Sequence, residues 1–391
     1  MRKGLLSVVT GNTPEVRGTL VDSLLRASPG AAVLSVSVHA TATGHPVVQR
    51  CPSGVVPRLR DIAAQGTTGD PVVILRQDLH ALWRAADRPH VILVLPENLD
   101  LLPLLAELWR RRVGSGSMGD YYDPAPVVVG VDPASFTYDI ACVHRAVRLW
   151  GDWDDGERVT RAEAAARQVE AADVLFVPAA RDADGQVTGA AGLARHLNPR
   201  ASLLTPADGD GLPPALVRVA PPGLWEERQA WLEPVTMPCL AHGPDGRVES
   251  VLWRARRPLH PERLSAALAE VARGVVRSRG HLWLPGRPDS IVTWRTAGAH
   301  LELREAGSWL GADSPDAWAS VSPRRRTLAS WFWHDYYGER RDEIVFTGVD
   351  IDGLRIRAAL DEALLSDAEL SLGRDGWRSL ADPLIPGGGN P

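Results

Sequence analysis

Lysine is almost absent from this 391-residue chain, because Lys3 is the only lysine among its 43 basic lysine and arginine residues. This excludes a Schiff-base lysine or a phosphate-cradling lysine anywhere in the body of the protein. Cysteine is equally scarce: Cys51, Cys142 and Cys239 lie far apart in the sequence. No two of them form a C-x-x-C pair, which excludes a cysteine-built zinc site and a disulfide framework.

Long apolar runs and excess positive charge are also missing. No run approaches the roughly 18 apolar residues of a membrane helix, and the opening stretch MRKGLLSVVTGN lacks a signal-peptide cleavage site. The formal net charge is −5, which argues against bulk binding of nucleic acid, DNA included. We therefore expect a cytoplasmic protein with no membrane partner, and the length favours two domains.

Residues 1–204 alternate short apolar runs with amphipathic segments, which is typical of βαβ units. This alternation predicts an α/β domain with a doubly wound parallel sheet. The predicted strands are Leu5–Thr10, Ala32–Val38, Val91–Leu95, Pro126–Val131 and Val174–Val177, and the predicted helices are Val16–Arg26, Leu75–Ala86, Leu101–Arg112 and Arg161–Ala172.

The composition and hydrophobic pattern of the sequence change after residue 204. Residues 205–247 are dense in proline and glycine and are interpreted as a linker. Residues 248–384 then predict a smaller α+β domain, and residues 385–391 a frayed tail. The predicted strands of this domain are Glu249–Arg254, His281–Leu284, Ser290–Arg295, Ala299–Glu305 and Ile344–Val349, and its predicted helices are Pro261–Val276 and Leu354–Leu365.

The first strand and helix meet at TGNTPEVRGT, a setting where a phosphate loop of the pattern G-x-x-x-x-G-K-[ST] works. Gly11 fits that pattern, but Val16 stands at the second glycine, and Arg17 replaces the lysine. Gly18 replaces the metal-binding hydroxyl, and Thr19 comes one position late. Two interpretations stay open: a structural strand–turn–helix, which is favoured, or a vestigial nucleotide site made of Gly11, Arg17, Gly18 and Thr19.

The C-terminal half contains sequence motifs that are more specific than the altered phosphate loop. ARRPLHPERL, VVRSRGHLWLPGRPD, EIVFTGVDID, LLSDAEL and a final ADPL follow one another in order. They resemble the C-terminal domain of the CobW family of P-loop GTPases, which are associated with metal delivery and zinc homeostasis. In the N-terminal half, ILRQDL, DGERVTRAEAAARQVEAADVLFV and HLNPRA resemble further segments of that family. The resemblance implies a P-loop GTPase-like N-terminal domain and a CobW C-terminal domain.

The departures from the family fall on its chemistry. Besides the altered phosphate loop, Asp70–Val73 replaces the C-x-C-C metal motif, and Val94, Pro96 and Glu97 replace the residues that follow the third family strand. Pro178–Arg181 replaces the guanine-reading N-K-x-D. One aspartate does not substitute for three thiolates in a zinc relay. Four altered motifs together favour a degenerate GTPase with no catalytic residue and no metal ligand, so an enzyme is not expected.

The pattern resembles a branch of ribosome-hibernation-factor-recruiting GTPases that acts under zinc limitation. This implies a recruiting scaffold whose partner is the ribosome or a hibernation factor. The alternative is an active, divergent GTPase metallochaperone that binds GTP and Mg²⁺ with Arg17 in the role of the lysine. A third hypothesis is contact with a partner or RNA through C-terminal basic residues, namely Arg257, His260, Arg263, Arg277 and Arg279. For His260, a capping or packing role is favoured over ligand contact.

Overall fold

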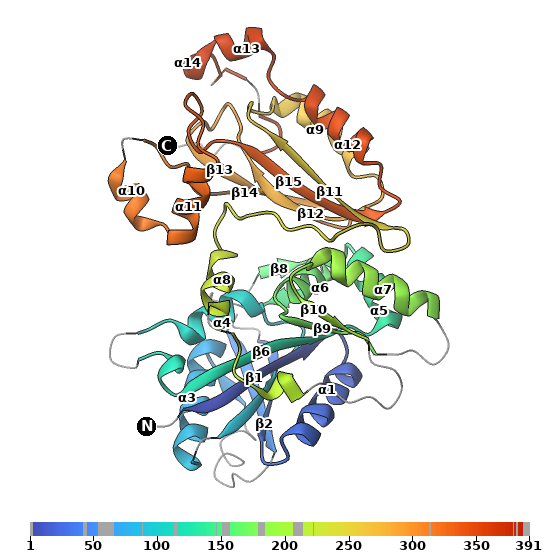
Figure 1. The fold of residues 1–391 in the computed structure, drawn as a ribbon, viewed down its shortest axis with the longest axis vertical. Coiled ribbons are helices and arrows are strands. Elements are labelled where there is room, and N and C mark those ends of the chain that lie inside the picture. Colours follow the sequence, from blue (N-terminus) through green and yellow to red (C-terminus); the bar gives the residue numbers. More distant parts are fainter. Residues whose placement is uncertain are drawn as a thin grey trace. The chain divides into compact units, whose positions relative to one another are not determined.

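The chain folds into two compact units, Met1–Gln229 and Ala230–Pro391, each with its own sheet (Figure 1). We call them the N-terminal and C-terminal units. None of the helices in the described part of the chain is long and apolar enough to cross a membrane. The computed structural model describes residues 3–41, 45–53, 66–87, 89–112, 116–145, 147–150, 157–178, 184–205, 214–221, 223–312, 314–377, 379–380 and 382–385.

The N-terminal unit is built on an eight-stranded sheet of order β10-β9-β6-β1-β5-β2-β3-β4. Pairings from β10 to β2 are parallel, which confirms the predicted α/β class. β3 and β4 add an antiparallel edge that the sequence analysis did not predict. The strands are β1 (Gly4–Gly11), β2 (Ala32–Ala40), β3 (Pro46–Ser53), β4 (Thr67–Thr68), β5 (His90–Val94), β6 (Tyr122–Gly130), β9 (Val174–Phe176) and β10 (Ser202–Leu204).

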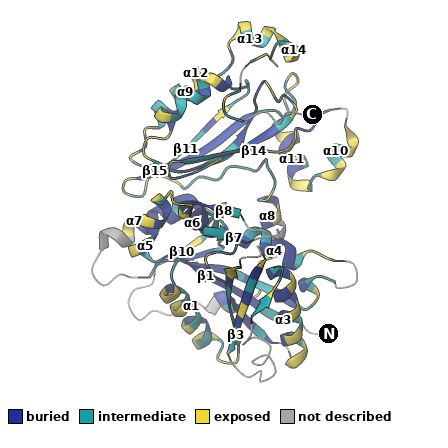
Figure 2. Cartoon of the chain, turned by 180° about the vertical axis from the view of Figure 1, so that it is seen from behind, coloured by how far each residue is buried: buried dark blue, intermediate teal, exposed yellow. Residues whose placement is uncertain are grey.

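Helices cover both faces of this sheet, which explains why its central strands are apolar throughout and buried (Figure 2). The helices α1 (Pro14–Ala27) and α3 (Pro71–Ala85) lie on opposite sides of β1 (Figure 1). The other elements are α4 (Leu101–Trp109), α5 (Pro133–Ala141), α6 (Arg161–Glu170), α7 (Asp184–Leu197), α8 (Leu224–Ala230), the 3₁₀ turns η2 (Met118–Asp120) and η3 (Pro214–Val217), and the small pair β7 (Val147–Leu149) and β8 (Glu157–Val159).

The stretch interpreted as a linker, residues 205–247, contains η3 and α8, and the N-terminal unit extends to Gln229. A buried ion pair between Arg228 of α8 and Asp173 fastens this stretch to the N-terminal unit. Burial lowers the pKa of the Arg228 guanidinium to about 10.

The C-terminal unit has a five-stranded antiparallel sheet of order β11-β15-β12-β13-β14. Its apolar core lies between this sheet and the helices α9 and α12, with Trp253, Trp294 and Phe346 among the buried side chains. The elements are β11 (Val248–Ala255), α9 (Pro261–Val271), β12 (Val275–Leu282), β13 (Ser290–Ala297), β14 (His300–Ser308), α10 (Pro315–Ser320), α11 (Pro323–Trp331), β15 (Asp342–Val349), α12 (Gly353–Glu362), α13 (Asp367–Ser371) and α14 (Gly373–Trp377).

One prediction in this unit is wrong: the helix expected over Pro261–Val276 ends at Val271, and a strand begins at Val275. Gly274 makes the change of direction with a φ of +76°, a conformation that favours glycine. A Cβ at Gly274 would also lie 2.8 Å from the carbonyl oxygen of Val349. A close approach between the α9–β12 turn and β15 therefore sets the helix end, and helical periodicity does not reveal it.

Candidate functional site

The turn between β1 and α1 is the first candidate site. β1 ends at Gly11 and α1 begins at Pro14, so only Asn12 and Thr13 connect them. Thr13 is the helix N-cap, and its hydroxyl accepts the backbone N–H of Val16 at 3.3 Å. A phosphate loop needs a longer connection whose backbone N–H groups are free to face the anion. In this turn an N–H is capped by a side chain and Pro14 has none.

Val16 closes the space beside this turn. Its side chain is 3% exposed and packs against Gly11 and Gly130. A Cβ at Gly11 would lie 2.6 Å from Val16 Cγ1, and a Cβ at Gly130 would lie 2.8 Å from Val16 Cγ2. Both glycines therefore permit close packing of α1 on β1 and β6. The residue at the position of the second phosphate-loop glycine thus fills the interior with an apolar side chain.

Arg17 bridges the carboxyl ends of two neighbouring strands. Its Nη1 donates to the carbonyl oxygen of Gly11 at 2.7 Å and to Glu97 Oε2 at 2.7 Å. Glu97 lies just after β5, which pairs with β1 in parallel. This is the edge of an open α/β sheet where ligands ordinarily bind. The Arg17 guanidinium is instead occupied by groups of the protein itself.

The four predicted nucleotide-site residues separate into two pairs. Gly11 and Arg17 lie together at the turn, whereas Gly18 and Thr19 are on the exposed side of α1. The Thr19 hydroxyl donates to the carbonyl oxygen of Glu15 one turn earlier, at 3.1 Å. An added Cβ at Gly18 would meet no atom within 4 Å, so no close approach requires this glycine.

Asn12 links the turn to α5, a contact that the sequence analysis missed. Its side-chain oxygen accepts the backbone N–H of Asp132 at 2.8 Å, and its Nδ2 donates to Ser135 Oγ at 2.8 Å. Asp132 in turn caps α5, and Asp139 of α5 pairs with Arg161 at 3.3 Å. The polar groups of this sheet edge are therefore engaged with one another.

The position of the family metal motif, Asp70–Val73, is the start of α3. Asp70 is the N-cap, and its Oδ1 accepts the backbone N–H of Val72 at 2.7 Å. Val72 is 1% exposed, so it serves the core. Among the described residues no group of three or more His, Cys, Asp or Glu side chains is placed to hold a metal ion. The donors at this position do not fit a zinc relay.

The LRQDL segment directly after that position holds the unit together. Arg76 is buried and donates through Nη1 and Nη2 to four backbone carbonyl oxygens at and after the end of α4. Asp78 forms an ion pair with Arg50 of β3 at 3.2 Å. Burial raises the pKa of the Asp78 carboxyl, and Arg50 opposes that rise. These two residues therefore tie α3 to α4 and β3, and need no ligand to explain them.

The altered guanine-reading motif falls largely outside the described residues. Pro178 lies just after β9, at the carboxyl end of a parallel strand. Residues 179–181 lie outside the described part of the chain.

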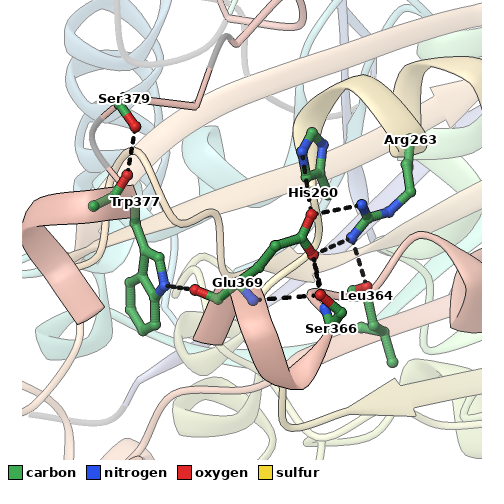
Figure 3. A network of polar contacts seen from close by, with 8 residues as sticks. His260, Arg263, Leu364, Ser366, Glu369, Trp377 and Ser379 are labelled. Atoms are coloured by element: carbon green, nitrogen blue, oxygen red, sulfur yellow. Dashed lines mark hydrogen bonds and ion pairs between the residues drawn. The ribbon is translucent and has the colours of Figure 1, made fainter. Parts of the chain in front are cut away.

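In the C-terminal unit, Arg263 and Glu369 form the centre of a polar network (Figure 3). The two side chains make paired hydrogen bonds of 2.8 and 2.7 Å, and His260 Nε2 lies 3.8 Å from Glu369 Oε1. Glu369 also accepts the backbone N–H of Ser366 at the start of α13, at 2.8 Å. These hydrogen bonds, that of Arg263 first, lower the pKa of the Glu369 carboxyl to about 2.

The other predicted basic contact residues do not form one free patch with these. Arg257 pairs with Asp367 at 2.7 Å, beside the same network. Arg277 lies on β12, is 3% exposed and donates to the carbonyl oxygen of Thr296 at 3.1 Å. Arg279 is half-buried on the same strand. The RPLHPERL segment therefore joins the start of α9 to the LLSDAEL segment, a role internal to the unit.

Comparisons with known proteins show which proteins this chain is similar to. Residues 248–364 match the cobalamin synthesis protein CobW C-terminal domain. The chain is 30% identical to zinc chaperone Rv0106 of Mycobacterium tuberculosis over 321 residues, 81% of this chain and 76% of that protein. It is 31% identical to zinc-regulated GTPase metalloprotein activator 1 of Dictyostelium discoideum over 202 residues, 49% of this chain and 42% of that protein.

Among solved structures, Zn(II)-bound YjiA GTPase from E. coli aligns with a TM-score of 0.34 and 14% identity, covering 93% of this chain and 100% of that chain. The relationship itself rests on the mycobacterial zinc chaperone, which matches over most of both chains, and on the C-terminal domain. This chain therefore belongs to the CobW family of P-loop GTPases.

Proposed function

We propose that this protein is a CobW-family member of zinc homeostasis that works through protein contacts and has lost GTP hydrolysis. The names of two relatives, a zinc chaperone and a zinc-regulated GTPase metalloprotein activator, support the link to zinc. The partner we propose is a ribosome hibernation factor, or the ribosome itself, recruited when zinc is scarce. The resemblance of the altered motifs to the recruiting branch of the family motivates this choice.

The observation that carries the loss of hydrolysis is the closed β1–α1 turn. Val16 fills the space beside Gly11, and Arg17 is bonded to Gly11 and Glu97. Catalysis of phosphoryl transfer depends on a backbone cradle, a cation on the phosphates and a hydroxyl on Mg²⁺. The Thr19 hydroxyl, which a divergent GTPase would use for the metal, is bonded to the carbonyl oxygen of Glu15 on the exposed side of α1.

Hydrolysis is tested by measuring phosphate release from GTP and Mg²⁺ by the purified chain. The proposal predicts a rate equal to the background without protein. Arg26→Ala is a matched control for Arg17→Ala, because Arg26 lies on the same helix and bonds only to Ser23 among the described residues. Protein-dependent release that Arg17→Ala abolishes and Arg26→Ala leaves intact would establish the alternative, a divergent GTPase.

Recruitment is tested separately, by co-sedimentation of the chain with ribosomes from zinc-starved and zinc-replete cells. We expect association from starved cells, together with a hibernation factor, and none from replete cells. Equal association under both conditions, or none under either, contradicts recruitment without touching the question of hydrolysis. Adding GTP to the starved extract should leave the association unchanged, since the proposed scaffold needs no nucleotide.

A further inference from the structure

Strand β14 forms a long edge of the C-terminal sheet. In the described part of the chain it has one neighbour, β13, and none of its nine residues is buried. The N-terminal sheet ends instead in β10 and β4, which are three and two residues long. Short edge strands, edge prolines, β-bulges and charged side chains are the ordinary protections against pairing with another chain. β14, with the sequence HLELREAGS, is long and has no proline. Its register irregularity falls after Glu305, so its protection before that point is charge alone.

The β13–β14 turn fixes which backbone groups of β14 are used. Ala297 and His300 are the last paired residues, so Gly298 and Ala299 form a two-residue turn. Gly298 has a φ of +57°, as such turns require. The pair that flanks a two-residue turn exchanges both hydrogen bonds, and hydrogen-bonded pairs alternate with the others along an antiparallel ladder. From His300 to Glu305, before the register shifts, the even-numbered residues of β14 therefore direct their backbone groups toward β13.

The odd-numbered residues direct their N–H and C=O groups toward the open edge. These are Leu301, Leu303 and Glu305, which pair with β13 at positions without hydrogen bonds. Leu301 and Leu303 are partly buried and pack against the core of the unit. The edge thus presents three donor–acceptor pairs next to apolar side chains that a further strand would cover.

The charges on this edge complement themselves. Glu302 and Arg304 flank Leu303, and they share one face of the strand, with their side chains 2.9 Å apart. If a second β14 lies antiparallel with Leu303 opposite Leu303, Glu302 of each copy stands opposite Arg304 of the other. Shifting the centre by one residue puts Glu302 opposite Glu302 or Arg304 opposite Arg304, which is unfavourable.

We propose that β14 is a dimerisation edge that takes a second copy of this chain, antiparallel and centred on Leu303. In this register all three outward pairs exchange hydrogen bonds, because Leu301 stands opposite Glu305. The Glu302 and Arg304 positions fall on the pairs without hydrogen bonds, where opposing side chains lie closest. The two sheets join into one, and the leucines of each copy extend the core of the other.

The other long edge of the sheet does not offer this pairing. β11 carries Glu249 and Arg254, which are an odd number of residues apart. In symmetric antiparallel pairing with matched hydrogen bonds, two residues can stand opposite one another only if their sequence numbers differ by an even number. Glu249 and Arg254 therefore never stand opposite one another. The self-complementary edge is therefore β14.

Sedimentation of the full chain over about 1–100 µM tests the proposal through charge swaps, with dissociation constants as the readout. The wild-type chain should be a dimer. Glu302→Arg and Arg304→Glu each place like charges opposite one another at two symmetric positions, and each should raise the dissociation constant about tenfold or more. An equimolar mixture of the two variants should form heterodimers with wild-type affinity, because unlike charges are then opposite at both positions.

The mixture also serves as the folding control, since a misfolded variant would not restore a dimer. Glu249→Arg on β11 is the matched control and should leave the dissociation constant unchanged. A wild-type chain that stays monomeric at about 100 µM overturns the proposal. A dimer whose dissociation constant is insensitive to both single variants also overturns it, since another surface then makes the contact. The proposal is independent of nucleotide and of recruitment.

Discussion

The packing of Val16 between two glycines makes a prediction that a double-mutant cycle tests. Val16→Ala removes two buried methyl groups, which at about 0.8 kcal/mol each, with a cavity contribution added, costs about 2 kcal/mol of unfolding free energy. Gly130→Ala inserts a Cβ 2.8 Å from Val16 Cγ2 and 3.0 Å from Leu20 Cδ1. Overpacking of this kind costs about 1–3 kcal/mol.

The double variant should be less destabilised than the sum of the two single variants. Once Val16 is alanine, the methyl group at position 130 enters the space that the valine left, and it also restricts the unfolded chain. We expect the sum to exceed the cost of the double variant by about 1 kcal/mol or more. Denaturant titration of the full chain measures the free energy of unfolding. The value is taken from the unfolding transition that both single variants shift.

Gly18→Ala is the matched control for this cycle. Gly18 is exposed on α1, and an added Cβ meets nothing within 4 Å. Alanine should therefore stabilise the helix by about 0.5–1 kcal/mol. If the two single effects at Val16 and Gly130 add without coupling, the side chain does not fill the turn and our reasoning about the closed phosphate-loop position fails.

Three further predictions concern stability. Arg76→Ala should cost at least about 3 kcal/mol by leaving carbonyl oxygens at the end of α4 unpartnered, whereas Arg84→Ala, an exposed change on the same helix, should lie within about 0.5 kcal/mol of wild type in the same titration. The pKa of Glu369 is lowered, to about 2, so its stabilisation is present above the unfolded pKa of about 4.3 and is lost as pH falls toward 2. Melting temperatures from pH 6 to 2 should accordingly fall more steeply for wild type than for Glu369→Gln, and parallel curves would contradict the pairing with Arg263. Burial raises the pKa of Asp342 well above its usual value, so stability should fall as pH rises above the unfolded pKa of about 3.9. Asp342→Asn should remove that fall between pH 4 and 8, and an unchanged slope would mean that the carboxyl is ionised in the fold.

Local sequence patterns predicted the strands and helices that form the N-terminal core. Leu5–Thr10 and Val91–Leu95 correspond to β1 and β5, because buried parallel strands are apolar along their whole length. Strand β3 was missed, since its PVVQRCPS sequence shows no regular alternation of polar and apolar residues and includes two prolines. Its place in the sheet depends on antiparallel pairing with β2, which no local pattern reveals.

The candidate site was harder to predict because its contacts are distant in sequence. The departure from the phosphate-loop pattern was visible at Val16, Arg17 and Gly18, but the partner of Arg17, Glu97, lies 80 residues away. The one available signal was that Glu97 lies three residues after the end of a buried strand. Likewise, the basic residues of RPLHPERL were considered as a contact surface, whereas Arg263 pairs with Glu369 across 106 residues.

Our central proposal, that the β1–α1 turn is closed to a nucleotide, is tested most directly by calorimetric titration of the full chain with GTP in the presence of Mg²⁺. The account predicts no saturable heat with wild type, with Arg17→Ala or with Arg26→Ala up to about millimolar nucleotide, because Val16 and the Arg17–Glu97 pair occupy the turn. Saturable binding at micromolar GTP that disappears in Arg17→Ala and persists in Arg26→Ala would contradict it.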